Sequence, residues 1–185
     1  FCAALGNDSN GTALLALYNN EGIDTSFLSL LDDYPTGLAA VMVGDDGNNR
    51  IIVYPGANLH IPEKKITEAL DSSPDALFMQ LEIAPEAVVF AANEAAKRRI
   101  PVFIDAGPAD RSFPLASPPT LEVFSPDAAA TEIFTGIKPT DEASCEKAAK
   151  ALSRLVRSHY YVIKLGGRGC YVTDLDCSVT VPTFP

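Results

Sequence analysis

In Tyr161-Val-Ile-Lys-Leu-Gly-Gly-Arg-Gly-Cys-Tyr-Val172, an apolar segment runs into three glycines within four residues and continues as a second apolar segment. The pattern predicts two strands joined by a glycine loop. Because glycine has no Cβ and tolerates positive φ, backbone N–H groups in such a loop can approach a ligand closely. Lys164 and Arg168 add positive charge that suits a polyphosphate. A tight turn with solvated cations is the alternative, and the loop alone does not decide between them.

Composition limits the kind of protein that this chain can form. Its 185 residues are 47% hydrophobic, enough for one compact domain with a sizeable core. The 24 acidic and 14 basic residues give a formal charge of −10, which repels a phosphate backbone and argues against nucleic-acid binding. No apolar run has the length of a membrane span, and the first residues lack the order of a signal peptide. We therefore expect a cytoplasmic protein without a membrane partner.

Histidine and cysteine are too scarce for several common kinds of site. The chain has two histidines and four cysteines, with no Cys-x-x-Cys pair, which argues against a zinc site and against Ser-His-Asp or Cys-His hydrolases. Cys170 and Cys177 fall on two predicted short strands, and in a cytoplasmic chain we expect them to be reduced thiols that pack. Any catalysis must then use carboxylates, lysine and the backbone.

Four short apolar runs, at residues 76–81, 101–104, 121–124 and 160–165, are not alternating and predict strands buried on both faces. Apolar residues at helical spacing predict helices between these strands. They are Val88, Val89, Ala92, Ala95 and Ala96 in a helix over 85–99, and Ala148, Ala149, Leu152 and Leu155 in a helix over 142–156. Strand and helix in alternation predict an α/β fold with a mostly parallel sheet flanked by helices.

The N-terminal part has a different pattern. Segments 37–43 and 50–54 are separated by the turn-rich residues 44–49, which predicts an antiparallel hairpin. Such a hairpin forms an edge or a flap on an α/β sheet. Further upstream, residues 12–20 predict a helix that Asp8 or Ser9 would cap.

Short motifs follow one another along the chain in a specific order. Together they resemble the ribokinase-like (PfkB) family of carbohydrate kinases, and the resemblance covers the whole chain. It implies a ribokinase-like, Rossmann-like fold in which the hairpin at about 37–54 is part of a small β lid over the sugar. The motifs are Gly6-Asn-Asp-Ser-Asn-Gly11, Glu21-Gly-Ile-Asp24, Thr36-Gly37, Pro55-Gly-Ala-Asn58, Gln80-Leu-Glu82, Asp105-Ala-Gly-Pro-Ala109, Ser125-Pro-Asp-Ala-Ala-Ala-Thr-Glu-Ile-Phe-Thr-Gly136 and Lys164-Leu-Gly-Gly-Arg-Gly169.

The resemblance assigns roles to matching residues. Glu82 matches the glutamate that hydrogen-bonds a sugar hydroxyl, and it follows a predicted parallel strand, beyond which ligands bind in open α/β sheets. Its alternative role is a solvated acid before the helix that starts at Pro85. The nucleotide-binding loop of the family, which holds ATP through backbone amides, matches Lys164, Leu165, Gly166, Gly167, Arg168 and Gly169.

The chain departs from the family pattern at one motif. Where the family has Asn-x-x-Glu, which organises magnesium and phosphate, this chain has Asp127-Ala-Ala-Ala130. Glu132 is a poor substitute, since two residues along a helix turn the side chain by about 200°. Asp127 either binds the metal and the nucleotide phosphates or only improves the helix start, and both alternatives stay open.

By the same resemblance, residues 1–185 are an incomplete domain. The Gly-Ala-Gly-Asp segment with the catalytic aspartate would follow Pro185, and the sugar-contacting aspartate and a Gly-Gly-Lys region would precede Phe1. No catalytic residue is therefore expected within the chain.

The function implied is the central portion of an ATP-dependent kinase that phosphorylates a hydroxyl of ribose or a related sugar. Its cofactors would be ATP and Mg²⁺, with a monovalent cation as an additional candidate, and its partners would be the sugar, ATP and a second copy joined through the lid. The loss of glutamate at Ala130 suggests the alternative of a non-catalytic, sugar- or nucleotide-binding regulatory relative. A nicotinamide-binding protein is disfavoured because Gly-x-Gly-x-x-Gly is missing.

Overall fold

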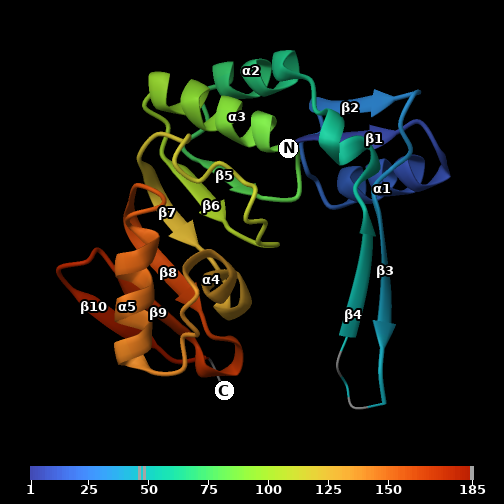
Figure 1. Ribbon diagram of the computed structural model, residues 1–185. Coiled ribbons are helices and arrows are strands. Elements are labelled where there is room, and N and C mark those ends of the chain that lie inside the picture. Colours follow the sequence, from blue (N-terminus) through green and yellow to red (C-terminus); the bar gives the residue numbers. More distant parts are fainter. Residues whose placement is uncertain (46, 48, 184–185) are drawn as a thin grey trace. The chain divides into compact units, whose positions relative to one another are not determined.

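The computed structural model describes residues 1–45, 47 and 49–183. Strands and helices alternate along the chain (Figure 1), which confirms the α/β fold class. The chain divides into two compact units. The first consists of Phe1–Ser72 with Glu82–Ala87, and the second consists of Ser73–Leu81 with Val88–Pro185.

The first unit holds a parallel strand pair, an antiparallel hairpin and three helical segments. Strand β1 pairs with β2 in parallel, and β3 pairs with β4 in antiparallel register from Leu38 opposite Tyr54 onward. The hairpin was predicted and is confirmed, whereas β2 and the second helix had no prediction. The elements are β1 (Cys2–Gly6), α1 (Ser9–Asn20), β2 (Phe27–Leu31), β3 (Leu38–Val43), β4 (Asn49–Tyr54), the 3-10 helix η1 (Gly56–His60) and α2 (Glu63–Asp71).

Asp8 connects α1 to the base of the hairpin. Its Oδ1 accepts hydrogen bonds from the Gly11 N–H at 2.8 Å and the Thr36 hydroxyl at 2.7 Å, while Oδ2 accepts the Thr36 N–H at 2.8 Å. Asp8 is thus the N-cap, as one of the two expected alternatives, and α1 starts three residues before the predicted Thr12. One carboxylate therefore fixes both a helix start and the residue before the hairpin.

The hairpin itself packs little. Every residue of β3 is exposed, and so are residues 50–54 of β4, on both faces of the ribbon. Of the predicted connection over 44–49, Asp46 and Asn48 lie outside the described residues. The exposed apolar side chains of the hairpin include Leu38, Val41, Met42, Val43, Ile51, Ile52, Val53 and Tyr54.

The second unit is built on a six-stranded sheet of order β10-β9-β8-β7-β6-β5. Strands β5 to β8 are parallel, as predicted, and β9 and β10 are antiparallel additions. The elements are β5 (Leu77–Gln80), α3 (Pro85–Lys97, which starts in the first unit), β6 (Val102–Asp105), β7 (Leu121–Ser125), α4 (Ala128–Thr135), α5 (Glu142–Leu152), β8 (Ser158–Lys164), the 3-10 helix η2 (Gly166–Arg168), β9 (Cys170–Thr173) and β10 (Ser178–Val181).

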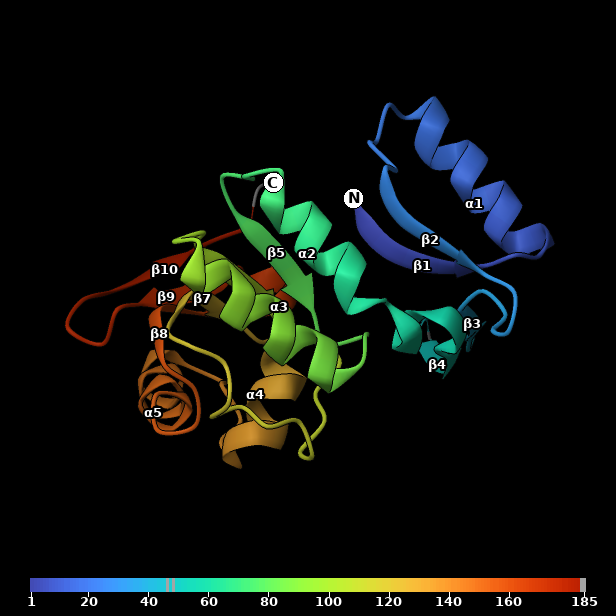
Figure 2. The same cartoon turned by 90° about the horizontal axis from the view of Figure 1, so that it is seen from above.

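Only one face of this sheet is fully buried, so the prediction of strands buried on both faces is wrong. Helices α3, α4 and α5 lie on the same side of the sheet (Figures 1 and 2). Alternate strand residues face them and are buried, and most of the residues between are exposed or half-buried. In one row across the opposite face, Phe78 is 69% exposed and Tyr160 is 43% exposed. The buried residues on the helix side include Val102, Ile104, Phe124, Tyr161 and Ile163, whereas Leu121, at the start of β7, is buried although its register places it on the opposite face.

Two helix predictions need correction. In α3, Ala96 is exposed and Val89 is only half-buried, because the buried stripe is shifted to Ala87, Val88, Ala91, Ala92 and Ala95. Helix α5 ends at Leu152, four residues before the predicted end. The chain turns there, so Val156 is buried and Leu155, expected to point inward, is 37% exposed.

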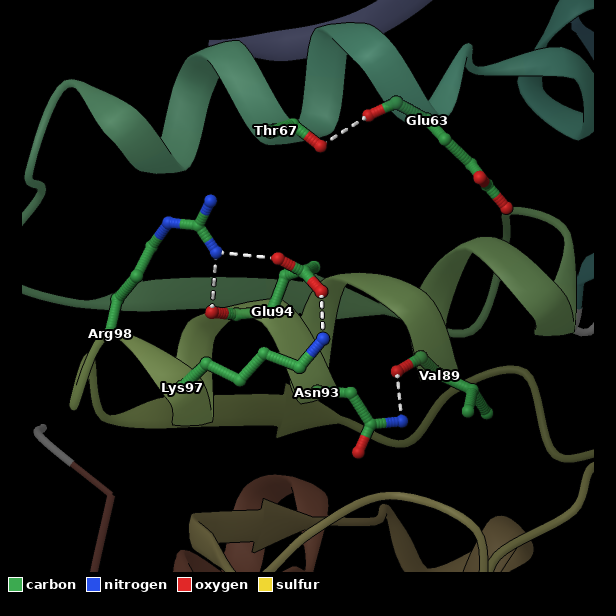
Figure 3. Close-up of polar contacts among 7 residues, drawn as sticks. All are labelled: Glu63, Thr67, Val89, Asn93, Glu94, Lys97 and Arg98. Carbon is green, nitrogen blue, oxygen red and sulfur yellow. Dashed lines mark hydrogen bonds and ion pairs between the residues drawn. The ribbon is translucent and has the colours of Figure 1, made fainter.

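Local contacts satisfy the polar side chains of the helices (Figure 3). Glu94 of α3 accepts hydrogen bonds from Lys97 and Arg98, three and four residues further along the helix. Asn93 donates to the Val89 carbonyl at 2.9 Å. In α2, the Thr67 hydroxyl donates to the Glu63 carbonyl at 3.0 Å. Pairs at this spacing are neighbours on a helix surface.

All four cysteines are free thiols. Cys170 pairs in register with Val181, and Cys177 precedes β10, so these two residues do not face each other. Across the described residues, no helix combines the length and apolar character that a membrane crossing requires.

Candidate functional site

Three strand ends bring charged residues together at the carboxyl edge of the parallel sheet. Strand β6 ends at Asp105 and β8 ends at Lys164, and Asp127 follows β7 by two residues. The Lys164 N–H donates to the Pro126 carbonyl at 2.9 Å, and Asp127 forms an isolated bridge with Lys164. The Lys164 ammonium forms an ion pair with Asp105. This edge is where open α/β sheets bind ligands.

Lys164 starts the glycine loop, which joins β8 to β9 as predicted. Residues Gly166–Arg168 form η2, and the Leu165 N–H donates to the Gly169 carbonyl at 2.8 Å, which closes the loop. Among the described residues, the N–H groups of Gly166 and Gly167 have no hydrogen-bond partner. Two successive unpaired N–H groups at a strand end are the donor arrangement that binds anions.

The three glycines have different physical reasons to be glycine. Gly166 and Gly169 have φ of +60° and +89°, which glycine tolerates and L-residues avoid. A Cβ on Gly169 would also lie 1.9 Å from the Val181 carbonyl oxygen. Gly167 lacks a positive φ, and nothing lies within 4 Å of its added Cβ. The packing of the described residues therefore gives no reason for glycine at position 167.

The two loop cations have partners in the protein, although Arg168 is exposed and Lys164 is partly exposed, so the alternative of a tight turn with solvated cations stays open. Lys164 is held by Asp105, and Arg168 donates to the carbonyls of Pro139, at 2.9 Å, and Thr140. The segment bound by Arg168 leads into α5, whose start is fixed by the capping residue Asp141. Hydrogen bonds from Ser144, and more weakly the positive charges of Lys147 and Arg168, hold the Asp141 pKa below its usual value.

Asp127 is the N-cap of α4. Its Oδ1 accepts the Ala130 N–H at 2.7 Å, which confirms the expected role in the helix start. Its Oδ2 accepts no hydrogen bond from the described residues. Ala130, at the position where the family has glutamate, is 3% exposed. The cap therefore uses one carboxylate oxygen and leaves the other available.

The carboxylates at this edge are the candidate metal ligands. No group of three or more His, Cys, Asp or Glu side chains suited to a metal occurs within the described part of the chain. Mg²⁺ often binds through one or two carboxylates together with substrate phosphates and water. Asp105 and Asp127 fit that donor set, provided that a nucleotide supplies the phosphates.

Glu82 lies two residues beyond the end of β5, in the first unit, and it is exposed. Its carboxylate accepts no hydrogen bond from any described residue, so it does not cap α3, which starts at Pro85. The sugar role of Glu82 stays a prediction.

Sequence reasoning missed the pairing of Asp105 with Lys164. Their opposite charges at the ends of two predicted strands of one sheet were the available signal.

Comparisons with known proteins agree with this architecture. A family model described as pfkB family carbohydrate kinase matches residues 1–185. Haemophilus influenzae ribokinase is 32% identical over 188 residues, which cover 100% of this chain and 60% of that protein. Thermotoga maritima ribokinase superposes with a TM-score of 0.76 at 27% identity, covering 100% of this chain and 60% of that one.

A structure of Arabidopsis thaliana ribokinase complexed with ribose and ATP superposes with a TM-score of 0.85 at 23% identity. It covers 100% of this chain and 61% of that chain, and at this identity it shows the shared fold alone. The chain thus spans about 60% of the length of each of these three relatives. With the family match over its full length, the chain belongs to the pfkB family of carbohydrate kinases.

Proposed function

We propose that this chain is the central part of an ATP-dependent sugar kinase, which transfers the γ-phosphoryl group of ATP to a hydroxyl of ribose or a related sugar. Family membership supports this activity, and so do ribokinase relatives, one of which binds ribose and ATP. The observation that carries the proposal is Gly167. It has no conformational or packing reason to lack a side chain, and its own N–H and that of Gly166 have no hydrogen-bond partner among the described residues. Close approach of a nucleotide phosphate supplies the reason.

Each candidate residue then has a task at the phosphoryl group. The Gly166 and Gly167 amides donate to phosphate oxygens, and the rest of the loop, from Lys164 to Gly169, holds those amides in place. The free oxygen of Asp127, with Asp105 beside Lys164, would hold Mg²⁺, and bound Mg²⁺ neutralises phosphate charge. In this chemistry, positioning and electrostatic stabilisation supply most of the rate increase.

At the sugar end, the free carboxylate of Glu82 accepts a hydrogen bond from a sugar hydroxyl. The hairpin β3–β4 acts as a lid that excludes water, so that the phosphoryl group goes to the sugar. Its apolar residues, exposed on both faces, also suit pairing with the lid of a second copy in a homodimer.

The enzyme would work in the cytoplasm, where ATP is supplied and its free thiols stay reduced. A monovalent cation remains a further proposed cofactor.

A second function is favoured by one observation. Ala130 provides no carboxylate beside Asp127, and its side chain is buried. A protein with a weakened metal site would bind sugar or nucleotide without turnover and act as a regulatory relative.

The deciding experiment uses the complete protein that contains this chain. We expect ADP release from ATP and Mg²⁺ to depend on added ribose. Nucleotide binding without sugar-dependent turnover would favour the regulatory relative. No binding of either ligand would exclude both functions.

The sugar site is tested by Glu82→Ala, with Glu86→Ala, an exposed acid four residues further along, as the matched control. Removing a charge-assisted hydrogen bond costs about 1.5 to 3 kcal/mol, so sugar affinity should fall at least about ten-fold while ATP affinity is unchanged. Calorimetry measures both affinities. Equal sugar affinity in Glu82→Ala and the parent would return Glu82 to the role of a solvated acid.

A further inference from the structure

A hollow of about 620 Å³ lies in the second unit, at the C-terminal end of α4. Its volume is within the range of small-molecule sites. It shares no residue with the glycine loop or with the charged strand ends. Its walls come from the loop before β7, the end of α4 and the turn after α5, and they are formed by Arg111, Phe113, Pro114, Leu115, Ala116, Ile133, Phe134, Thr135, Gly136, Arg154 and Leu155.

Two guanidinium groups give the hollow its charge. Arg111 donates through Nε to the Ile133 carbonyl at 3.0 Å, which orients its guanidinium plane, and neither terminal nitrogen has a hydrogen-bond partner among the described residues. Among the described residues, the Arg154 side chain has no hydrogen-bond or ion-pair partner. No aspartate or glutamate lines the hollow. Two arginines without a carboxylate are notable in a chain of net charge −10.

Two carbonyls at the end of α4 are already paired. Helix C-termini carry partial negative charge on their unpaired carbonyls. Here the Gly136 N–H donates to the Glu132 carbonyl at 2.8 Å, and Arg111 donates to the next one, at Ile133. Among the described residues, the terminal nitrogens of Arg111 and Arg154 have no hydrogen-bond partner, so they are available as donors. Arginine donates in a planar fork that matches carboxylate and phosphate oxygens.

The rest of the lining is apolar. Leu155 and Ile133 are 37% and 38% exposed, and Phe113 is buried. Leu155 is the residue that helix periodicity places inward, and the early end of α5 turns it into this hollow instead. A ligand that covers these side chains would remove apolar surface from water, which stabilises the complex.

We propose that this hollow binds a small organic anion, with an apolar body against Ile133 and Leu155 and a carboxylate or phosphate head on Arg111 and Arg154. The site is separate from the sugar and nucleotide sites, because no residue is common to them.

The experiment uses the complete protein and 2-naphthoate, with the neutral analogue naphthalene-2-methanol as the matched probe. NMR titration and calorimetry measure binding to the parent and to Arg111→Gln, Arg154→Gln and Arg157→Gln. Arg157 is exposed and outside the hollow, so it is the control. We expect saturable 2-naphthoate binding that weakens at least ten-fold in Arg111→Gln and Arg154→Gln and less than two-fold in Arg157→Gln.

Thermal unfolding identifies any variant that fails to fold. Should Arg111→Gln unfold, Arg154→Gln decides the question, because the exposed Arg154 side chain makes no hydrogen bond or ion pair with the described residues. The proposal is overturned if the neutral analogue binds as tightly as 2-naphthoate, or if Arg154→Gln binds 2-naphthoate as tightly as the parent. It is also overturned if Gly167→Ala loses 2-naphthoate binding, because the anion would then bind at the glycine loop.

Discussion

At the scale of single residues, neighbouring glycines in one loop separate a structural requirement from a functional one. Gly169 has a positive φ and a carbonyl oxygen in the place of its missing Cβ, whereas Gly167 has neither. Both are the same residue in the sequence, so the motif alone cannot tell them apart. The backbone geometry distinguishes Gly169 from Gly167, so substitutions at the two positions can be compared as a matched pair.

Gly169→Ala should lower the free energy of unfolding by about 2 kcal/mol or more, since it combines a left-handed conformation with a steric clash. Gly167→Ala should leave that free energy unchanged or raise it by up to about 1 kcal/mol, because alanine fits there. The second variant should nevertheless lose ATP affinity about ten-fold. Denaturant unfolding and nucleotide titration measure the two effects, and full ATP affinity in Gly167→Ala would contradict the phosphate role.

Asp127 combines a helix cap with a proposed metal ligand, and two substitutions separate these roles. Asparagine caps helices as well as aspartate does, so Asp127→Asn should keep the parent stability, whereas Asp127→Ala should lose about 1 kcal/mol. Both remove the carboxylate and should raise the Mg²⁺ concentration needed for half-maximal turnover. Rates measured against Mg²⁺ test this. An unchanged Mg²⁺ requirement in Asp127→Asn would confine Asp127 to the cap.

At the scale of elements, the hairpin β3–β4 depends on a contact outside its own strands. Its side chains are exposed, but Asp8 holds Thr36 at its base with two hydrogen bonds and caps α1 with a third. These hydrogen bonds, first from the Gly11 N–H and then from Thr36, lower the pKa of Asp8 from its ordinary 3.8. The anchoring of the hairpin is therefore linked to pH.

Because the folded pKa of Asp8 lies below the unfolded value, its contribution to stability is present above pH 3.8 and is lost as pH falls through the folded pKa. The difference in unfolding free energy between the parent and Asp8→Asn should be largest near neutral pH and should shrink in acid. Asp33→Asn, at an exposed aspartate without a hydrogen bond to described residues, is the control. Urea unfolding from pH 3 to 7 measures the difference, and a gap that does not vary with pH would contradict this linkage.

At the scale of the whole chain, sequence reasoning predicted the order of the strands and helices better than the burial of their faces and the long-range contacts between them. The four parallel strands, the hairpin and the glycine loop follow from apolar runs and turn residues. The prediction that both faces of these strands are buried was wrong. An apolar side chain, such as that of Phe78 or Val179, does not by itself determine whether another layer of the protein packs on it. The Asp105–Lys164 pair also escaped prediction, since it joins residues 59 positions apart across an intervening strand.

The 185 residues alone should show no sugar-dependent ADP release. None of the residues that match family motifs is a catalytic base, and phosphoryl transfer to a hydroxyl needs a group that accepts the proton. The longer protein supplies the positive control in the same assay. Turnover above background by the 185 residues would contradict this expectation and would direct the search for a base to Asp105, Asp127 and Glu82.

Because helices cover one face of the six-stranded sheet and leave the other open, the cysteines of the second unit differ in their access to solvent. Cys145 is buried on the inner side of α5 and Cys177 is exposed, while Cys170 lies half-buried on the apolar face that the helices leave open. Of these three thiols, Cys177 should react fastest with a maleimide and Cys145 slowest, without any mutation, and the half-buried Cys2 is followed as a separate site. In a longer polypeptide, any segment that packs on this face would lower the alkylation rate of Cys170. The rates of Cys145 and Cys177 would serve as the slow and fast references.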